Sequence, residues 1–122
     1  MNKHETKVWI YAEGGSNART CVLLQGNLPL WSEIGRATET QAKYKALIQA
    51  LDLLSKEKTK RIIIYTDCRY LIGQLSKKWS VNPSTYSHVR LLNRARDLKK
   101  QVKNCFITYM TKTELKQKLE VS

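Results

Sequence analysis

The chain of 122 residues is poor in proline, cysteine and acidic residues, and it contains no long apolar segment. No apolar run approaches the roughly 20 residues that a membrane-spanning helix needs, and the N-terminal residues do not resemble a signal peptide. The three cysteines lie far apart without Cys-x-x-Cys spacing, which argues against a disulfide framework and against a zinc site. We therefore expect an intracellular protein without a membrane anchor, whose cysteines are small buried residues.

The shortage of acidic residues leaves a positive charge that is unevenly distributed along the chain. In total, 22 basic and 10 acidic residues give a formal net charge of +12. Residues 1–40 carry four charges of each sign and are neutral, whereas residues 41–75 carry +4 and residues 76–122 carry +8. A basic C-terminal half indicates a polyanionic partner, most often nucleic acid. The alternative is a solvated surface that keeps the domain soluble.

The apolar pattern predicts one domain over residues 1–122, with a core from about residue 8 to residue 110. Runs of β-branched and aromatic residues predict strands at 8–13, 21–25, 28–34, 62–66 and 105–109. Helical spacing of apolar residues predicts helices at 38–56, at 69–75 and from about 84 or 87 onward, then a short one at 113–119. The core order β-β-β-α-β-α-α-β is typical of an α/β fold with a mixed five-stranded sheet flanked by helices.

Two carboxylates end two of the predicted strands. Asp67 follows the β-branched run 62–66 directly, where it is either a helix N-cap or a functional group at the sheet edge. Glu13 ends the first strand, which can lie beside the strand 62–66. Together they could hold Mg²⁺, which prefers oxygen ligands. A third ligand is expected on the inner face of the crossing helix, where the chain carries Lys43.

Three segments together resemble ribonuclease H, in particular the compact type common in archaea and retroelements. They are Ile10-Tyr-Ala-Glu13-Gly, Thr38-Glu-Thr-Gln-Ala-Lys43-Tyr-Lys-Ala-Leu and Tyr65-Thr-Asp67-Cys-Arg-Tyr-Leu-Ile-Gly-Gln-Leu75. The family pattern is Y-T-D-G, then T-N-N-x-A-E-Y-x-A-L, then Y-T-D-S-x-x-x-x-x-x-L, in this order. The resemblance implies an RNase H-like fold.

The resemblance also implies a metal site, which this sequence has changed. In the family, four acidic residues hold two Mg²⁺ ions that hydrolyse the RNA strand of an RNA–DNA hybrid. Glu13 stands for the first aspartate, Asp67 is unchanged, and Lys43 replaces the helical glutamate. The fourth carboxylate lies in an A-D-x-L-A helix that has no counterpart here, and Glu114 and Glu120 are poor substitutes.

The lysine at position 43 decides the expected chemistry. Two unit charges about 4 Å apart interact with roughly 4 kcal/mol at an effective dielectric near 20. Between the ammonium group of Lys43 and an incoming Mg²⁺ this interaction is repulsive. Either the ammonium group of Lys43 pairs with Glu13 and Asp67, or it extends to solvent and leaves one weak Mg²⁺ site on those carboxylates. We therefore expect a degenerate active site without a cofactor, in which Mg²⁺ would serve only a residual activity.

Several basic residues are candidates for contact with nucleic acid. Arg36 and Thr38 match an R-x-T element that grips a DNA phosphate in some relatives, although Thr38 is equally suited to be an N-cap closed by Gln41. Phosphate contacts and stacking are also expected from the basic helix and the loop before it, through Arg90, Arg94, Lys77, Lys78 and Trp79. The buried stripe of that helix is expected at Leu91, Ala95, Leu98 and Val102.

These observations predict a catalytically degenerate, retroelement-derived RNase H-like domain that binds an RNA–DNA hybrid or duplex. Two alternatives remain open. The first is a non-catalytic structural or protein-interaction module within a larger protein, with a protein partner. The second is a residual Mg²⁺-dependent ribonuclease H that uses Glu13 and Asp67.

Overall fold

The computed structural model describes residues 5–56, 61–76, 86–102 and 104–120. The strands are β1 (Glu5–Glu13), β2 (Gly15–Leu24), β3 (Leu30–Ala37), β4 (Arg61–Thr66) and β5 (Cys105–Tyr109). The helices are α1 (Glu39–Leu54), α2 (Arg69–Ser76), α3 (Tyr86–Gln101) and α4 (Lys112–Glu120). No helix in these ranges is long and apolar enough to cross a membrane. The predicted order of the core elements is confirmed, with α4 as a ninth element.

The five strands form one mixed sheet in the order β3-β2-β1-β4-β5. β1 pairs with β2, and β2 with β3, in antiparallel hairpins, while β1–β4 and β4–β5 are parallel pairs. Parallel neighbours need a crossover connection, and the one between β1 and β4 consists of β2, β3 and α1. As a result, the carboxyl ends of β1 and β4 lie at the same end of the sheet.

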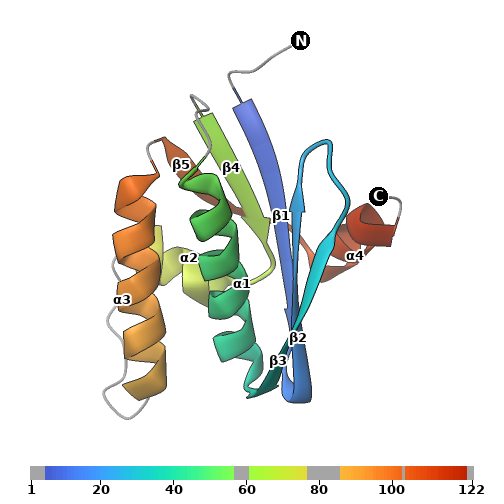
Figure 1. Cartoon of the computed structure of the whole chain (residues 1–122), viewed down its shortest axis with the longest axis vertical. Coiled ribbons are helices and arrows are strands. Elements are labelled where there is room, and N and C mark those ends of the chain that lie inside the picture. Colours follow the sequence, from blue (N-terminus) through green and yellow to red (C-terminus); the bar gives the residue numbers. More distant parts are fainter. Residues whose placement is uncertain (1–4, 57–60, 77–85, 103, 121–122) are drawn as a thin grey trace.

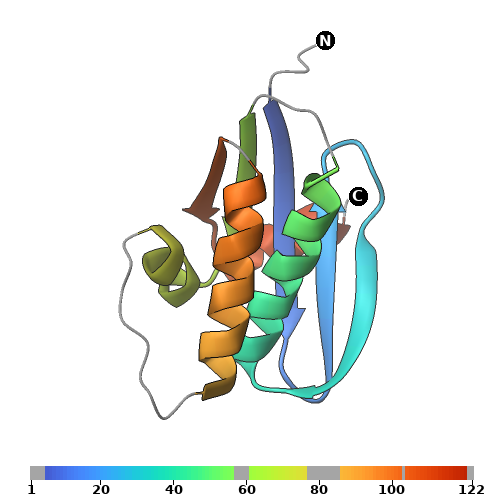
Figure 2. The same ribbon diagram turned by 60° about the vertical axis from the view of Figure 1, so that its left-hand side comes forward.

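The sheet separates two hydrophobic layers of unequal size (Figures 1 and 2). On one face, α1 and α3 lie side by side and bury the larger core, which includes Ile62 and Ile64 of β4. On the other face, α4 covers Trp9 and Tyr11 of β1. Alternate residues of β1 therefore contribute to different layers, as the period of a β-strand requires.

Several predicted boundaries were wrong, mostly by a few residues. β2 begins at Gly15 and not near residue 21, because Arg19 and Thr20 continue the ladder with β1 while Gly15 and Ala18 pair with β3. β3 begins at Leu30 and ends at Ala37, later than the predicted range at both ends. In α3 the predicted Ala95 and Leu98 are buried, but Leu92 is buried in place of the predicted Leu91, which is only partly buried. The three cysteines are free and buried, as expected.

A capping box starts α1 at the predicted residue. The backbone N–H of Gln41 donates to Thr38 Oγ1 over 3.1 Å, and the N–H of Thr38 donates to Gln41 Oε1 over 2.9 Å. This pair satisfies two backbone donors that a helix N-terminus otherwise leaves without partners. The cap fixes where α1 begins and hence which of its residues face the end of the sheet.

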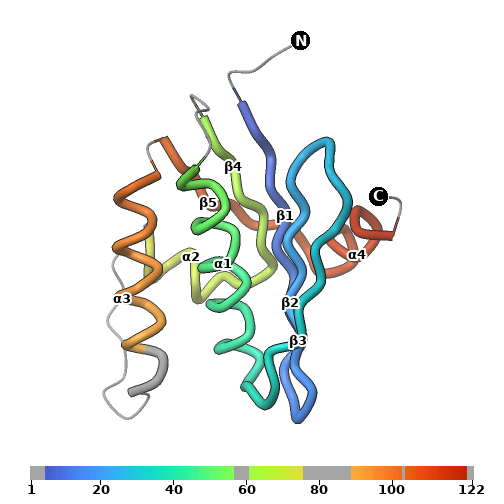
Figure 3. The backbone as a smooth tube through the Cα atoms, in the orientation of Figure 1, coloured from blue at the N-terminus to red at the C-terminus, as the bar shows by residue number. Residues whose placement is uncertain are grey.

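Gly14 brings the β1–β2 turn against the first residues of α1 (Figure 3). A Cβ atom at residue 14 would lie within 2.7 Å of the Cα atom of Glu39 and of the carbonyl carbon of Thr38. Both are backbone atoms, so no side chain can rotate away to relieve the overlap. The absence of a side chain at Gly14 therefore sets how closely β1 approaches the start of α1.

Gly14→Ala is expected to lower the free energy of unfolding by about 1–3 kcal/mol, because backbone has to shift to accept the methyl group. Urea unfolding followed by circular dichroism measures this loss. The control is Gly26→Asn, at a position with φ of +85° and open space around it, where Asn tolerates the left-handed conformation at a cost below about 1 kcal/mol. Equal losses for the two variants would contradict the close contact at Gly14.

Candidate functional site

The candidate site lies at the carboxyl ends of β1 and β4, beside the first turns of α1. The last register pair between these strands joins Trp9 to Tyr65. Continuing this register places Asp67 level with Tyr11, two residues before Glu13. The carboxylates thus lie at the same end of the sheet, as predicted, but they are not directly opposite one another.

Lys43 fills the space between α1 and the end of β4. Its Nζ atom lies 3.3 Å from Asp67 Oδ1 and 3.4 Å from Glu39 Oε1. The side chains of Lys43 and Asp67 are only 14% and 9% exposed, whereas that of Glu39 is 59% exposed. Lys43 therefore does not extend to solvent. It forms a nearly buried ion pair with Asp67 and a more exposed one within its own helix.

The electrostatic balance keeps Lys43 protonated. Burial alone lowers the pKa of a lysine, but the charge of Asp67, its hydrogen bond and the charge of Glu39 act in the opposite direction. The outcome is a pKa of Lys43 above its usual value. The site thus contains a permanent cation of the chain's own.

Glu13 belongs to a different network, on the other side of β1. Arg19, its register partner on β2, donates from Nε to Glu13 Oε1 over 2.7 Å, and the hydroxyl of Tyr11 donates to Glu13 Oε2 over 2.8 Å. The bonds from Arg19 and Tyr11, with the nearby charge of Lys116, lower the pKa of the Glu13 carboxyl. Burial and the hydrogen bond to Glu13 raise the pKa of the Tyr11 hydroxyl, so it remains a proton donor.

The two carboxylates therefore do not share a cation in this structure. Each has a cationic partner from the same chain, and the oxygens of Glu13 are directed toward β2 by Arg19 and Tyr11. Among the residues that the structure describes, no three histidine, cysteine, aspartate or glutamate side chains form a group that could hold a metal ion. A pair of Mg²⁺ ions, each needing several oxygen ligands, does not fit this arrangement.

The structure separates the two roles that the sequence allowed for Asp67. The cap position of α2 is taken by Cys68, whose Sγ accepts from the backbone N–H of Leu71 over 3.4 Å. The Cys68 N–H in turn donates to Thr66 Oγ1 over 3.2 Å. The carboxylate of Asp67 is directed to Lys43 instead, so the N-cap interpretation was wrong.

The candidate nucleic-acid contacts lie on several elements. Arg90 and Arg94 are exposed on α3, one helical turn apart. Arg36 is exposed near the end of β3, whereas Thr38 serves as the cap of α1. Lys77, Lys78 and Trp79 lie outside the described residues. The N-terminal ends of α1 and α3 point toward the same end of the molecule (Figure 1).

Sequence reasoning missed Arg19, Tyr11 and Lys116 as neighbours of Glu13. Treating residues 14–20 as a loop hid this contact, because Glu13 and Arg19 form the last register pair of the β1–β2 ladder, across a connection of residues 14–18. A hairpin with a loop of that length would have given the register. The sequence gave no indication that Lys116 lies near Glu13, because the position of Lys116 depends on how α4 docks against β1.

Removing either member of the Lys43–Asp67 pair is expected to destabilise the fold. Lys43→Met leaves a nearly buried carboxylate without its main partner, at a cost of about 3 kcal/mol, and Asp67→Asn leaves the ammonium group with Glu39 alone. The double variant is expected to recover much of the loss, because neither charge is then left without its partner. Urea unfolding of the four proteins gives the coupling energy. Simple addition of the two single losses would contradict a direct interaction.

Comparisons with known proteins agree with this architecture. An RNase H1 from the archaeon Halobacterium salinarum is 25% identical, with a TM-score of 0.80 over 92% of this chain and 89% of that chain. The N-terminal RNase H domain of a Mycobacterium tuberculosis protein is 24% identical, with a TM-score of 0.75 over 92% and 87%. LC11-RNase H1 in complex with an RNA/DNA hybrid is 18% identical, with a TM-score of 0.72 over 92% and 89%.

Comparison with curated protein sequences gave no match. A protein-family model described as reverse transcriptase-like matches residues 13–116, which is most of the chain and includes both strand-end carboxylates and Lys43. The mixed five-stranded sheet with its flanking helices is also the fold of the RNase H structures. The chain therefore belongs to the reverse transcriptase-like family and is an RNase H-like domain.

Proposed function

We propose that the chain is a non-catalytic RNase H-like domain, derived from a retroelement, that binds an RNA–DNA hybrid or duplex through a basic surface. The ammonium group of Lys43 takes the place that a metal ion has in catalytic relatives. The basic face of α3 then provides phosphate contacts, together with Arg36. The proposed domain therefore binds nucleic acid but does not hydrolyse it.

The observation that carries the proposal is the 3.3 Å ion pair between Lys43 Nζ and Asp67 Oδ1. A lysine at the surface could turn away and leave the carboxylate to a metal ion. Here the side chain is 14% exposed and lies against the carboxylate. A divalent ion would have to displace the ammonium group or approach it closely, and both are unfavourable in a poorly solvated site.

Support for a nucleic-acid partner comes from charge and from a relative. Residues 76–122 carry a net +8, and the exposed side of α3 includes Arg90 and Arg94. Arginine suits phosphate recognition because its planar guanidinium group donates two parallel hydrogen bonds. One structure with the same fold, LC11-RNase H1, is in complex with an RNA/DNA hybrid. An elongated polyanion is therefore the partner that this surface fits best.

The pure chain is expected to bind labelled RNA–DNA hybrid with an affinity that falls steeply as salt rises, and to leave it uncleaved in Mg²⁺ or Mn²⁺. Replacing Arg90 and Arg94 together by Gln should weaken binding about tenfold at low salt and reduce the slope of log K against log salt by about 2. Fluorescence anisotropy over a salt series measures both quantities.

The matched control replaces Lys56 and Lys112 by Gln, which removes the same net charge from exposed positions outside α3. If the control weakens binding as much as the α3 variant, net charge and not α3 determines the affinity. Absence of binding at low salt would reject the proposal. Cleavage of the hybrid that Asp67→Asn abolishes would establish a residual nuclease instead.

Lys43→Glu is expected to make the fold respond to divalent ions. The substitution places a second carboxylate against Asp67, so the melting temperature without metal should fall through like-charge repulsion. Added Mg²⁺ or Mn²⁺ should recover part of the loss, because an ion that binds only the folded state stabilises it. Thermal melting with and without metal measures this, with Lys45→Glu as the control on the same helix. A wild-type chain stabilised by Mg²⁺ as strongly as the variant would contradict the replacement of metal by Lys43.

A further inference from the structure

An apolar surface lies at the β3 side of the sheet, away from the candidate site. We name it the β3-edge surface. It comprises Leu24, Leu28, Leu30, Trp31 and Leu53. Four of these side chains are unusually exposed for large apolar groups, from 36% for Leu53 to 76% for Leu28. Single exposed leucines are ordinary, but several large apolar groups exposed together along one edge of a sheet mark an interaction surface.

Two adjoining grooves give the β3-edge surface its shape. One, of about 630 Å³, lies along the β2–β3 hairpin between Leu24, Leu28 and Leu30. The other, of about 240 Å³, lies between that hairpin and α1 and ends at Leu53. Val22 and Leu30 line both grooves, so they form one continuous depression.

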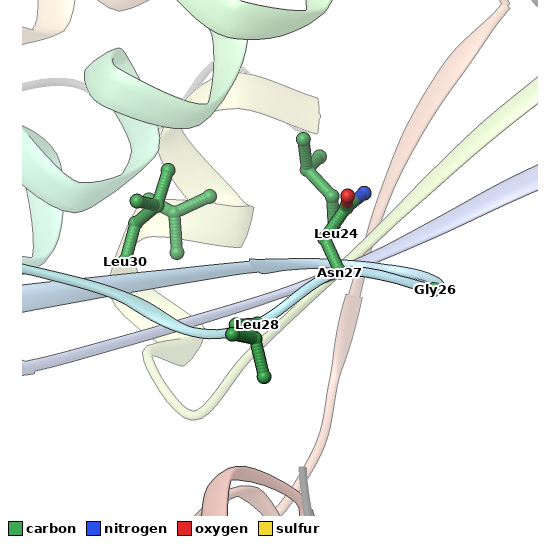
Figure 4. A pocket seen from close by; sticks show the side chains of 6 residues that line it. Leu24, Gly26, Asn27, Leu28 and Leu30 are labelled. Atoms are coloured by element: carbon green, nitrogen blue, oxygen red, sulfur yellow. The ribbon is translucent and has the colours of Figure 1, made fainter.

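The hairpin carries apolar groups on both of its sides. Figure 4 shows Leu24 and Leu30 pointing to the α1 side, while Leu28 points to the opposite side. Trp31 follows Leu30 and therefore faces away from α1, where it packs edge-on against Tyr11 at 6.0 Å. A strand that is apolar on both faces is typical of the interior of a sheet, where both faces are covered.

β3 is nevertheless an edge strand. In the sheet order β3-β2-β1-β4-β5 it pairs with β2 alone, and no described element pairs with its outer side. Natural proteins protect such edges with charge, proline or a covering segment, because an open ladder recruits further strands. At the other edge the exposed ring of Phe106 is covered by the guanidinium group of Arg61 at 5.1 Å. At the β3 edge Arg19 covers the ring of Trp31 at 4.3 Å and Pro29 precedes the strand, but Leu28 and Leu30 lie in a stretch, residues 20–32, without any charged residue.

We infer that a second copy of this chain occupies the β3-edge surface, with two β3 strands pairing antiparallel about a two-fold axis. The occupant should be an extended strand that starts with large apolar residues on both faces and has no net charge. β3 itself meets both requirements, with Leu30 and Trp31 at its start and one charge of each sign, at Glu33 and Arg36. In such a symmetric contact the leucines of each copy fill the groove of the other, as an isologous interface requires.

The charge distribution favours this contact over any other between two copies. A chain of net charge +12 resists self-association, but residues 1–40, which contain β1, β2 and β3, are neutral. The basic helix α3 lies at the opposite flank of the molecule from β3 (Figures 1 and 2). Pairing through β3 therefore keeps the two α3 helices at the outer ends, where their repulsion is smallest.

The geometry of the pairing also fixes where the helices of both copies lie. A two-fold axis through an antiparallel strand pair is perpendicular to the sheet, so both copies keep α1 and α3 on the same face of one ten-stranded sheet. Regular pairing is limited to residues 30–34, because Gly35, with φ of +75°, and the register shift opposite Ala18 interrupt the ladder. A short interface of this kind gives moderate affinity, in the micromolar range.

Sedimentation velocity of the full chain from about 1 to 100 µM tests the inference, since a moderate interface dissociates within that range. Samples are treated with nuclease and run at about 0.5 M salt, so that bound nucleic acid does not bridge copies. Wild type is expected to change from monomer to dimer with rising concentration. Leu30→Lys should raise the dissociation constant at least about tenfold, with an unchanged circular dichroism spectrum.

Phe106→Lys is the matched control, because Phe106 is 52% exposed at the opposite edge strand and Leu30 is 54% exposed. It should leave the dimer unaffected. Leu28→Lys is a second variant, in the loop before β3, and should weaken the dimer without touching the core. A wild type that stays monomeric over the whole range overturns the inference. So does a dimer that Phe106→Lys disrupts and Leu30→Lys does not.

Discussion

The end of the sheet depends on one constraint: a charge out of contact with water must be balanced by a partner close by. Lys43 and Asp67 meet this constraint for each other, with side chains that are 14% and 9% exposed. In a metal-dependent relative the balancing cation would come from solution, whereas here the chain carries it. Under the proposed function, this space stabilises the fold and does not bind ions. Glu13 pairs with Arg19 across the β1–β2 hairpin.

Much of the fold could be predicted from the sequence because its strongest signals are local. The capping box at Thr38 and Gln41 and the apolar run of β4 each depend on neighbouring residues alone, and both lie where expected. The early start of β2 was missed, because a strand made of small and polar residues is defined by its partner and not by its own pattern. The bounds of α4 were predicted to within one residue at each end, but its docking against β1 through Leu115 and Leu119 was not.

The site was predictable in position but not in detail. Strand order and helix periodicity placed Glu13, Lys43 and Asp67 at one end of the sheet, because topology alone decides which residues meet there. Whether the ammonium group of Lys43 pairs with Glu13 or with Asp67 depends on side-chain geometry and on competing partners. Arg19 supplies Glu13 with a cation of its own, so Lys43 is left to Asp67. A pairwise register of this kind cannot be read from the sequence until the length of the hairpin connection is known.

In the proposed non-catalytic domain, the ion pair also accounts for the acidic residue at position 67. Once Lys43 is present, replacing Asp67 by a neutral residue leaves an ammonium group in a poorly solvated position, and restoring a carboxylate at residue 43 places two like charges together. Each residue therefore keeps the other in place, and neither can change alone without loss of stability. A carboxylate at a catalytic position is consequently weak support for catalysis. It is more informative to know which cation lies beside the carboxylate, and whether the chain or the solvent provides that cation.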